Sequence, residues 1–289
     1  MEKLSYYIFL IFINTFRIIP FRVIYVVSDF LFFVLYRVVG YRKKVVRQNM
    51  IYAFPAISDT ELKLLEKRFY HYLADIFTES VKGISMNESQ FLKRFKVTNP
   101  EYINSFYEKG QSVIVYASHY GNWEWGACMG LQYSYKQSFV FYKPLSNRSI
   151  DKYLRVARKK FGMSLVSMRK TARIFEQNIE TPSVYFMVAD QKPHNLNRAH
   201  EVEFLSRQTL FIHGPAKYAK QYNYPVIYGD VRQVKRGYYT ITFKPVTEAP
   251  EHLSEEKITA NAVKELENVL LHDASKWLWS HRRWKYLMK

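Results

Sequence analysis

The segment SHYGNWEW (118–125) contains the two residues best suited to acid–base chemistry, His119 and Glu124. An imidazole can take a proton from an attacking hydroxyl, because its ordinary pKa lies near neutrality. A nearby carboxylate could orient the ring and stabilise its charged form. The spacing alone is a weak signal, since a histidine hydrogen-bonded within a turn would account for it as well. The pattern therefore gives a candidate general base and a candidate partner.

The predicted strand and helix on either side of these two residues favour a ligand-binding site between them. Residues 112–117 (SVIVYA) form a short β-rich run that predicts a strand, and a helix is expected from Trp123. Gly121, between them, allows a tight turn. Ligands of open α/β sheets bind in the crevice beyond the carboxyl ends of the strands. His119 is expected to lie at such an end.

A second pair of polar residues follows another predicted strand. Asp190 and Gln191 stand at the end of the run PSVYFMVAD (182–190), so both could face the same crevice. The alternative for Asp190 is a carboxylate that caps a turn.

The rest of the chain alternates between the two kinds of element. Residues 58–82 predict an amphipathic helix with a capping box of Ser58 and Glu61. Further strands are predicted at 138–144, 225–234 and 238–246, and further helices at 150–162, 214–223 and 254–272. The last two strands are expected to form a hairpin. The alternation predicts an α/β fold with a central, mostly parallel sheet flanked by helices.

The N-terminus is strongly apolar. Residues 4–16 and 23–36 are separated by Arg17, Pro20 and Arg22. Neither stretch reaches the roughly 20 residues that a spanning helix needs, and the segment lacks the small-residue cleavage site of a signal peptide. One tilted span or two interfacial helices broken at Pro20 would both fit, with a buried helical hairpin as the alternative.

Basic residues that follow the apolar stretch strengthen the membrane interpretation: Arg37, Arg42, Lys43, Lys44 and Arg47. Such residues favour the cytoplasmic face and bind anionic headgroups. We therefore expect residues 1–40 to be a membrane-associated helical segment and residues 41–289 to be a catalytic domain.

The composition restricts the partners. The 289 residues include 43 Lys and Arg against 25 Asp and Glu, a formal charge of +18 that indicates a polyanionic partner: nucleic acid, an anionic membrane, or acidic carriers and phosphorylated lipids. The single cysteine, Cys128, excludes an intrachain disulfide and is expected to pack in the core. His119 has no other ligands at metal-site spacing, so neither a metal nor a cofactor is expected.

Three tryptophans near the end of the sequence, Trp277, Trp279 and Trp284, alternate with basic residues. Such a mixture can stack nucleic-acid bases, lie at a membrane interface, or pack against the sheet. We expect the second and third roles together.

Several motifs in order resemble one family. They are the basic stretch YRKKVVRQNM (41–50), SHYGNWEW (118–125) with its His-x4-Glu spacing, YKPLSNRSIDKYLRVAR (142–158), VADQKP (188–193) and WLWSHRRWK (277–285). Over nearly its whole length the chain resembles the lysophospholipid acyltransferase superfamily, specifically its lipid A biosynthesis (lauroyl/myristoyl) acyltransferase branch.

The resemblance implies roles for individual residues. His119 is implied as the general base and Glu124 as its partner, in a direct attack of the acceptor hydroxyl on a thioester without an acyl-enzyme intermediate. Arg158 matches a family arginine that stabilises the oxyanion or binds the acceptor. Arg169 and Lys170 stand where the family often places a basic pair, near the acceptor phosphates, although exposed charges can also simply be solvated.

Two further positions follow from the resemblance. Asp190 and Gln191 match the family's Ala-Asp-Gln motif and are expected to contribute to substrate binding. Residues 192–213 depart from the family, because many members carry a Gly-rich, Phe-Pro-Phe-Phe-Gly type segment there. The segment 204–206 (Phe-Leu-Ser) is a diverged counterpart, so the substrate is less well defined than the chemistry.

The implied function is O-acyl transfer from acyl carrier protein or acyl-CoA to a hydroxyl of a lipid A precursor, on the cytoplasmic face of a Gram-negative inner membrane. The expected partners are that donor, the lipid acceptor and the anionic inner membrane surface, and not nucleic acid. A lysophospholipid or an acylated amino lipid would use the same site. A basic membrane- or nucleic-acid-binding protein without catalysis would explain the charge but not the ordered motifs.

Overall fold

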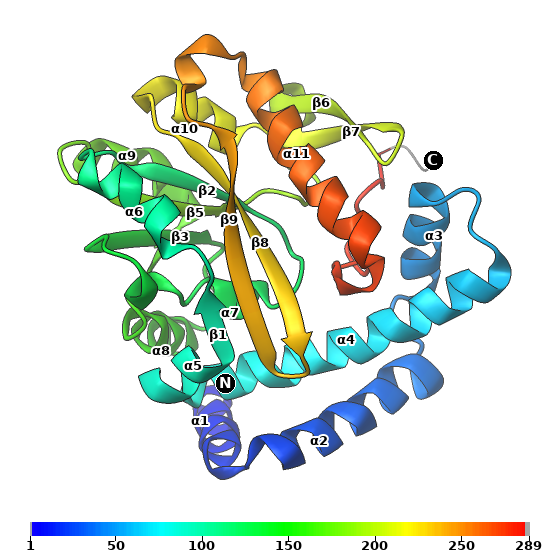
Figure 1. Ribbon diagram of the computed structural model, residues 1–289. Coiled ribbons are helices and arrows are strands. Elements are labelled where there is room, and N and C mark those ends of the chain that lie inside the picture. Colours follow the sequence, from blue (N-terminus) through cyan, green and yellow to red (C-terminus); the bar gives the residue numbers. More distant parts are fainter. Residues whose placement is uncertain (1, 287–289) are drawn as a thin grey trace.

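A seven-stranded sheet forms the centre of the computed structural model, which describes residues 2–286 (Figure 1). The strands lie in the order β1 (Phe95–Val97), β9 (Tyr238–Thr247), β8 (Val226–Lys235), β2 (Val113–Ala117), β5 (Ser183–Val188), β3 (Gln137–Tyr142) and β4 (Ser164–Ser167). All neighbouring pairs are parallel except β8 and β9, which form the expected antiparallel hairpin. The predicted α/β class with a mostly parallel sheet is confirmed.

The central strands are apolar because helices cover both faces of the sheet. All five residues of β2, VIVYA, are buried, as expected for a strand in the middle of a parallel sheet. The hairpin between β8 and β9 turns at Gly237, whose φ of +76° suits glycine. A side chain there would also collide with the hydroxyl of Tyr25.

Most of the predicted helices are confirmed. α4 (Asp59–Ser85) begins with the expected capping box of Ser58 and Glu61, and α11 (Glu255–His272) begins after Ser254, whose side chain caps it. α8 (Arg148–Lys159) and α10 (Gly214–Tyr222) also match. The helix expected from Trp123 is only the single turn α7 (Trp123–Gly126). Helices that were not predicted are α3 (Lys43–Ala53), α5 (Glu88–Arg94), α6 (Pro100–Glu108) and α9 (Thr171–Gln177).

A separate two-stranded hairpin occupies the region that departs from the family pattern. β6 (Ala199–Phe204) pairs antiparallel with β7 (Arg207–Ile212), and β6 packs on α11. The turn consists of Leu205 and Ser206, with φ values of +53° and +60°. Such left-handed pairs usually contain Asn or Gly, so the sequence carried no turn signal.

The N-terminal segment is two helices broken at Pro20: α1 (Glu2–Ile18) and α2 (Phe21–Phe33). In Figure 1, α2 runs beneath α4, and it also reaches the turn between β8 and β9, where Asp29 pairs with Arg236. The inner side of α2 is tied to α4 by the Ser28 hydroxyl, which donates to Asp75 at 2.6 Å.

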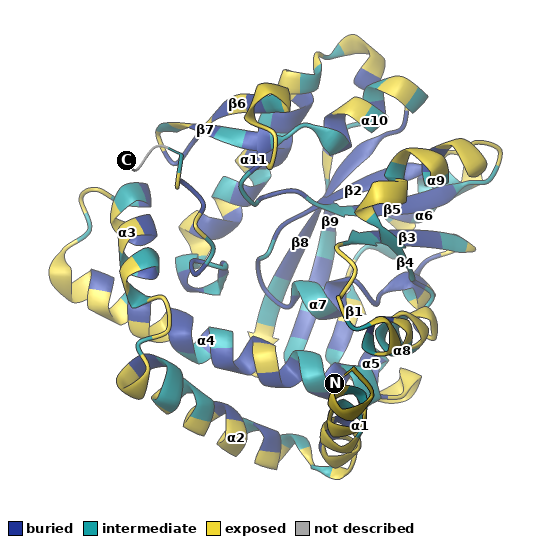
Figure 2. Ribbon diagram, turned by 180° about the vertical axis from the view of Figure 1, so that it is seen from behind, coloured by how far each residue is buried: buried dark blue, intermediate teal, exposed yellow. Residues whose placement is uncertain are grey.

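The outer surfaces of these helices are exposed (Figure 2), and they carry large apolar side chains. They are Leu4, Tyr7, Ile8, Ile11, Phe12, Ile18, Val23, Val26, Val27, Phe30 and Phe33. Within the described residues, no single helix is long and apolar enough to cross a membrane, whereas the bent pair 21–38 and 43–53, at 86°, meets the length and composition required. Membrane binding by residues 1–40, and the boundary at residue 40, remain predictions.

The C-terminal tryptophans lie in the core. Trp277 is 3% exposed, and Trp279 and Trp284 are fully buried. The expectation that they lie at a membrane interface is therefore wrong, while the expected packing is confirmed. Buried rings stabilise the protein through the apolar area they remove from water. Cys128 is buried as predicted.

Candidate active site

His119 and Asp190 lie side by side because the sheet register puts them there. Ala117, the last residue of β2, pairs with Val188, the last residue of β5. Each functional side chain follows two residues later, at the carboxyl edge of the sheet. The His119 ring Nδ1 lies 2.6 Å from Asp190 Oδ1, and the His119 main-chain N–H donates to Asp190 Oδ2 at 2.9 Å.

Asp190 is held as a carboxylate. It is 1% exposed, and the indole N–H of Trp277 donates to its Oδ2 at 2.6 Å. Burial opposes ionisation, but the charge of His119 and the hydrogen bonds from His119 and Trp277 outweigh it and lower the pKa of Asp190. An ionised acceptor at Nδ1 requires the proton on that nitrogen. The lone pair of the neutral ring is therefore on Nε2.

Gln191 marks the position where a substrate hydroxyl could meet the ring. Its side-chain nitrogen lies 3.1 Å from His119 Nε2. An amide N–H at this distance donates to the Nε2 lone pair. A hydroxyl that replaced it would be within reach for proton transfer.

Glu124 forms a different pair. Its carboxylate accepts a hydrogen bond from the guanidinium of Arg158, which projects from α8. Among the described residues, the side chains hydrogen-bonded to the His119 ring are those of Asp190 and Gln191, not that of Glu124. The sequence predicted one His–Glu pair, and the structure has a His–Asp pair and a Glu–Arg pair.

An apolar cavity of about 500 Å³ lies beside the second pair. Its walls come from α4, α7, the β3–α8 region, β4 and the C-terminal segment. They consist of Leu73, Ile76, Phe77, Ser80, Val81, Ile84, Trp123, Glu124, Tyr142, Lys143, Leu145, Leu154, Arg158, Leu165 and Leu278. Trp123 joins the cavity to the first pair, since its ring packs edge-on against His119 with centroids 5.4 Å apart. A largely apolar space with a few polar groups at one point is typical of a ligand site.

A buried glutamate supports the loop from below. Glu79 of α4 is fully buried and accepts hydrogen bonds from Asn122 Nδ2 at 2.8 Å, Tyr239 OH at 2.8 Å and Tyr25 OH at 3.0 Å. Asn122 in turn accepts from the main-chain N–H of Trp125 and so caps α7. Burial, reinforced by the charge of Asp75, raises the pKa of Glu79 to about 7.

Glu79 was missed in the sequence, although a signal was present. It lies three residues after Ile76 and seven after Tyr72, on the apolar face of the helix. A carboxylate at such a position must find polar partners when it is buried. The three donors come from elements distant in sequence, so periodicity along α4 cannot identify them.

The turn that presents His119 has no room for a larger residue at position 121. Gly121 has a φ of +59°, and a Cβ there would lie 2.6 Å from the carbonyl oxygen of Val231. Its carbonyl accepts from Tyr72 OH at 2.7 Å. On the other side, the N–H of Leu278 donates to the carbonyl of His119 at 3.1 Å, so the C-terminal segment forms one wall.

Arg169 lies apart from this cluster. It is exposed, in the single turn after β4, next to the equally exposed Lys170. β4 ends at the same edge of the sheet as β2 but three strands away, which is roughly 14 Å at the usual strand spacing. The structure therefore brings together His119, Gln191 and Asp190, and separately Glu124 and Arg158, and leaves Arg169 at the margin.

A histidine hydrogen-bonded to a carboxylate at the carboxyl edge of a parallel sheet, beside an apolar cavity, defines an α/β protein with a candidate general base next to a ligand site. Comparison with known families agrees: the family model described as bacterial lipid A biosynthesis acyltransferase matches residues 1–286. The chain belongs to this family and is an acyltransferase of lipid A, and hence lipopolysaccharide, biosynthesis. No curated protein matches the chain.

Proposed function

We propose that the chain transfers a fatty acyl group from acyl carrier protein or acyl-CoA to a hydroxyl of a lipid A precursor, with His119 as the general base. The observation that carries the proposal is the His119 ring, fixed by Asp190, beside an apolar cavity of about 500 Å³. The acyl chain would lie in the cavity, and the acceptor hydroxyl would replace the Gln191 amide at Nε2.

The reaction would take place in two steps. The acceptor hydroxyl gives its proton to His119 Nε2 while its oxygen bonds to the thioester carbonyl carbon, and the carbonyl oxygen becomes an oxyanion. The oxyanion then re-forms the carbonyl, the carbon–sulfur bond breaks, and the departing sulfur takes the proton from His119. Asp190 stabilises the imidazolium between the two steps.

Glu124 and Arg158 are proposed to serve the oxyanion. The Arg158 guanidinium lines the cavity where the thioester would lie and could donate to the developing negative charge. Its hydrogen bond to Glu124 fixes its position beforehand. Arg169, with Lys170, is proposed to contact the acceptor's phosphates from the margin of the site.

The proposed location is the cytoplasmic face of the inner membrane. The apolar outer surfaces of α1 and α2 and the basic residues that follow them support attachment to an anionic surface. The net charge of +18 would also attract an acidic carrier protein.

The test is mass spectrometry of the lipids, lipid A and aminolipids included, from a strain that lacks the gene. The strain is complemented with the wild type, with His119→Ala, or with His252→Ala, which changes an exposed histidine outside the site. We expect one acyl chain to be missing from lipid A and to return with the wild type and with His252→Ala only. An acyl chain missing from another lipid instead would identify that lipid as the acceptor. No change in any lipid would refute the proposal.

A further inference from the structure

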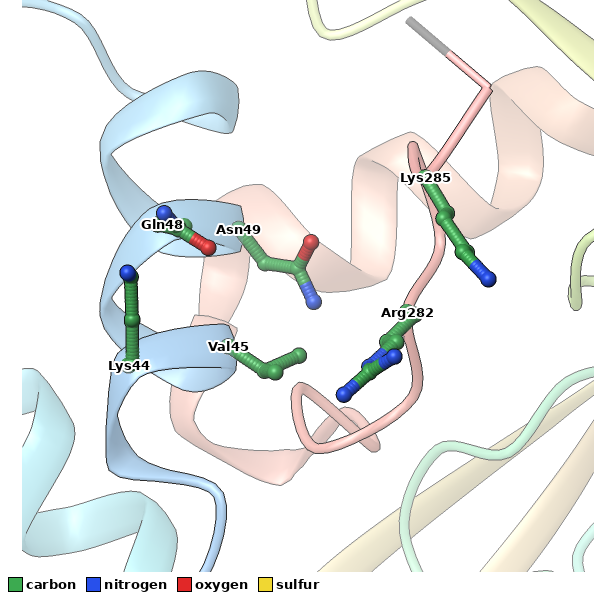
Figure 3. A pocket seen from close by; sticks show the side chains of 6 residues that line it. All are labelled: Lys44, Val45, Gln48, Asn49, Arg282 and Lys285. Carbon is green, nitrogen blue, oxygen red and sulfur yellow. The ribbon is translucent and has the colours of Figure 1, made fainter. Parts of the chain in front are cut away.

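A second cavity, of about 350 Å³, lies between α3 and the C-terminal segment 277–285. It is lined by Lys44, Val45, Gln48, Asn49, Arg282 and Lys285 (Figure 3). Figure 3 shows Asn49 and Val45 pointing from α3 into this space and Arg282 reaching towards α3 from the opposite wall. Three cations and two amides line this space, which is separate from the apolar cavity; in Figure 3 the Arg282 guanidinium extends towards α3, whereas the Lys285 side chain extends away from it.

Within residues 2–286, none of the three cations, Lys44, Arg282 and Lys285, forms an ion pair with a carboxylate. The neighbouring cations of α3 differ, since Lys43 and Arg47 lie 3.5 Å and 3.8 Å from the buried carboxylate of Glu66. Lys44, Arg282 and Lys285 are all exposed, so an anion that entered the space between α3 and the C-terminal segment would be attracted by three unpaired positive charges.

The walls of the cavity are held in place. The Asn49 side-chain amide donates to the carbonyls of Trp279 at 2.8 Å and His281 at 2.6 Å. The Arg42 guanidinium donates to the carbonyl of Ser280 at 3.1 Å. These bonds fix the C-terminal segment on α3, so little ordering would accompany ligand binding.

The surroundings indicate the source of the anion. α3 begins four residues after the apolar pair Val38 and Val39, whose side chains are 66% and 64% exposed. Cations next to an exposed apolar surface lie at the depth of lipid headgroup phosphates when that surface enters a membrane. The cavity is also close to the catalytic residues: Leu278 bonds to His119, and Arg282 follows four residues later, at most about 14 Å along the chain.

We propose that this cavity binds the phosphate group of a membrane lipid headgroup, and so holds a phosphorylated acceptor beside His119. The Arg282 fork can bind two phosphate oxygens, while Lys44 and Lys285 act as point charges. The assignment to the acceptor rests on the proposed function. Binding of the phosphate itself does not, since no acyl donor or transfer is needed to observe it.

The experiment compares two variants of the full chain that have the same net charge. The cavity variant combines Lys44→Gln, Arg282→Gln and Lys285→Gln. The control variant removes three exposed lysines elsewhere, Lys109→Gln, Lys257→Gln and Lys264→Gln. Binding is measured to phosphatidylcholine vesicles that contain either phosphatidic acid or cholesteryl hemisuccinate, an anionic lipid with a carboxylate headgroup, at equal surface charge and fixed ionic strength.

We expect the wild type and the control variant to bind the phosphatidic acid vesicles about tenfold more tightly than the hemisuccinate vesicles. The cavity variant should bind both kinds equally. Equal losses in the two variants would overturn the proposal, because only the overall charge would then matter. A cavity variant that keeps the preference but loses affinity for coenzyme A would also overturn it, since the anion would then be the donor's phosphate.

Three controls test whether the cavity itself accounts for this result. An unchanged thermal unfolding midpoint shows that the cavity variant folds, and Lys44→Arg with Lys285→Arg, which preserves the charges, should retain the phosphate preference. His119→Ala should bind both kinds of vesicle as the wild type does, because the base is not needed for binding. If the wild type prefers phosphate vesicles but shows no acyl transfer, phosphate binding by the cavity is supported and only the proposed reaction is refuted.

Discussion

A single carboxylate, that of Asp190, hydrogen-bonds both to the ring of His119 and to the main chain of the same residue. The ring is therefore fixed relative to its own backbone. Rotation of the imidazole would break one bond while the other held Asp190 in place. An imidazole held in this way does not have to be ordered when substrate arrives.

The first prediction concerns this pair. Asp190→Asn keeps the shape but replaces the charged acceptor at Nδ1 with a neutral amide. We expect kcat for acyl transfer to fall by about 10²–10⁴-fold, with little change in KM. The neutral amide would no longer hold the proton on Nδ1, and it would no longer stabilise the imidazolium. The control is Asp230→Asn, which changes a buried aspartate paired with Arg232 and Lys244. A variant with full kcat would show that Asp190 does not serve the base.

The second prediction separates the roles of Glu124 and Arg158. Arg158→Gln should lower kcat by about 10²–10³, as removal of an oxyanion donor does. Glu124→Gln keeps the guanidinium but removes the carboxylate that holds it in position. The fall in kcat should therefore be smaller for this variant, up to about 100-fold. The double variant should be no worse than Arg158→Gln, because Glu124 would act only through Arg158.

A double-mutant cycle on kcat makes this measurement. Arg155→Gln, on the exposed side of the same helix, serves as the control. Losses that simply multiply in the double variant would mean that Glu124 has a role of its own in the reaction.

The third prediction concerns pH and Glu79. Its pKa rises from 4.5 to about 7 on folding, so the folded state binds a proton that the unfolded state has released. The resulting stability is complete below pH 4.5 and is lost as the pH rises through 7. The loss amounts to roughly 3 kcal/mol.

Glu79→Gln cannot ionise and should lack this fall. The measurement is the free energy of unfolding of the wild type and of Glu79→Gln between pH 4 and pH 9. The prediction is tested by how the difference between the two proteins changes with pH. A constant difference would show that Glu79 does not carry the shift.

Much of the fold could be predicted because the signals were local. The run VIVYA over 113–117 has the composition of a buried strand, and Ser58 with Glu61 marks a helix start by two side chains three residues apart. The β6–β7 hairpin could not be predicted in this way. Its turn at Leu205 and Ser206 depends on a left-handed conformation that these residue types seldom adopt.

The site was predictable as a set of residues but not as a set of contacts. His119, Asp190, Glu124 and Arg158 were all singled out. Their pairing depends on strand register and on the placement of α8, which no short stretch of sequence contains. Spacing suggested that Glu124 serves His119 because they are close in sequence, whereas Asp190, 71 residues away, is the contact.

The wall formed by Trp277 and Leu278 has a consequence for how the protein is made. A ribosome completes β2, β5 and both residues of the His119–Asp190 pair long before it reaches position 277. Until then Asp190 lacks the indole that helps to keep it ionised, and the carbonyl of His119 lacks the N–H of Leu278. Synthesis halted before residue 277 therefore yields a chain with every proposed catalytic residue and no finished site.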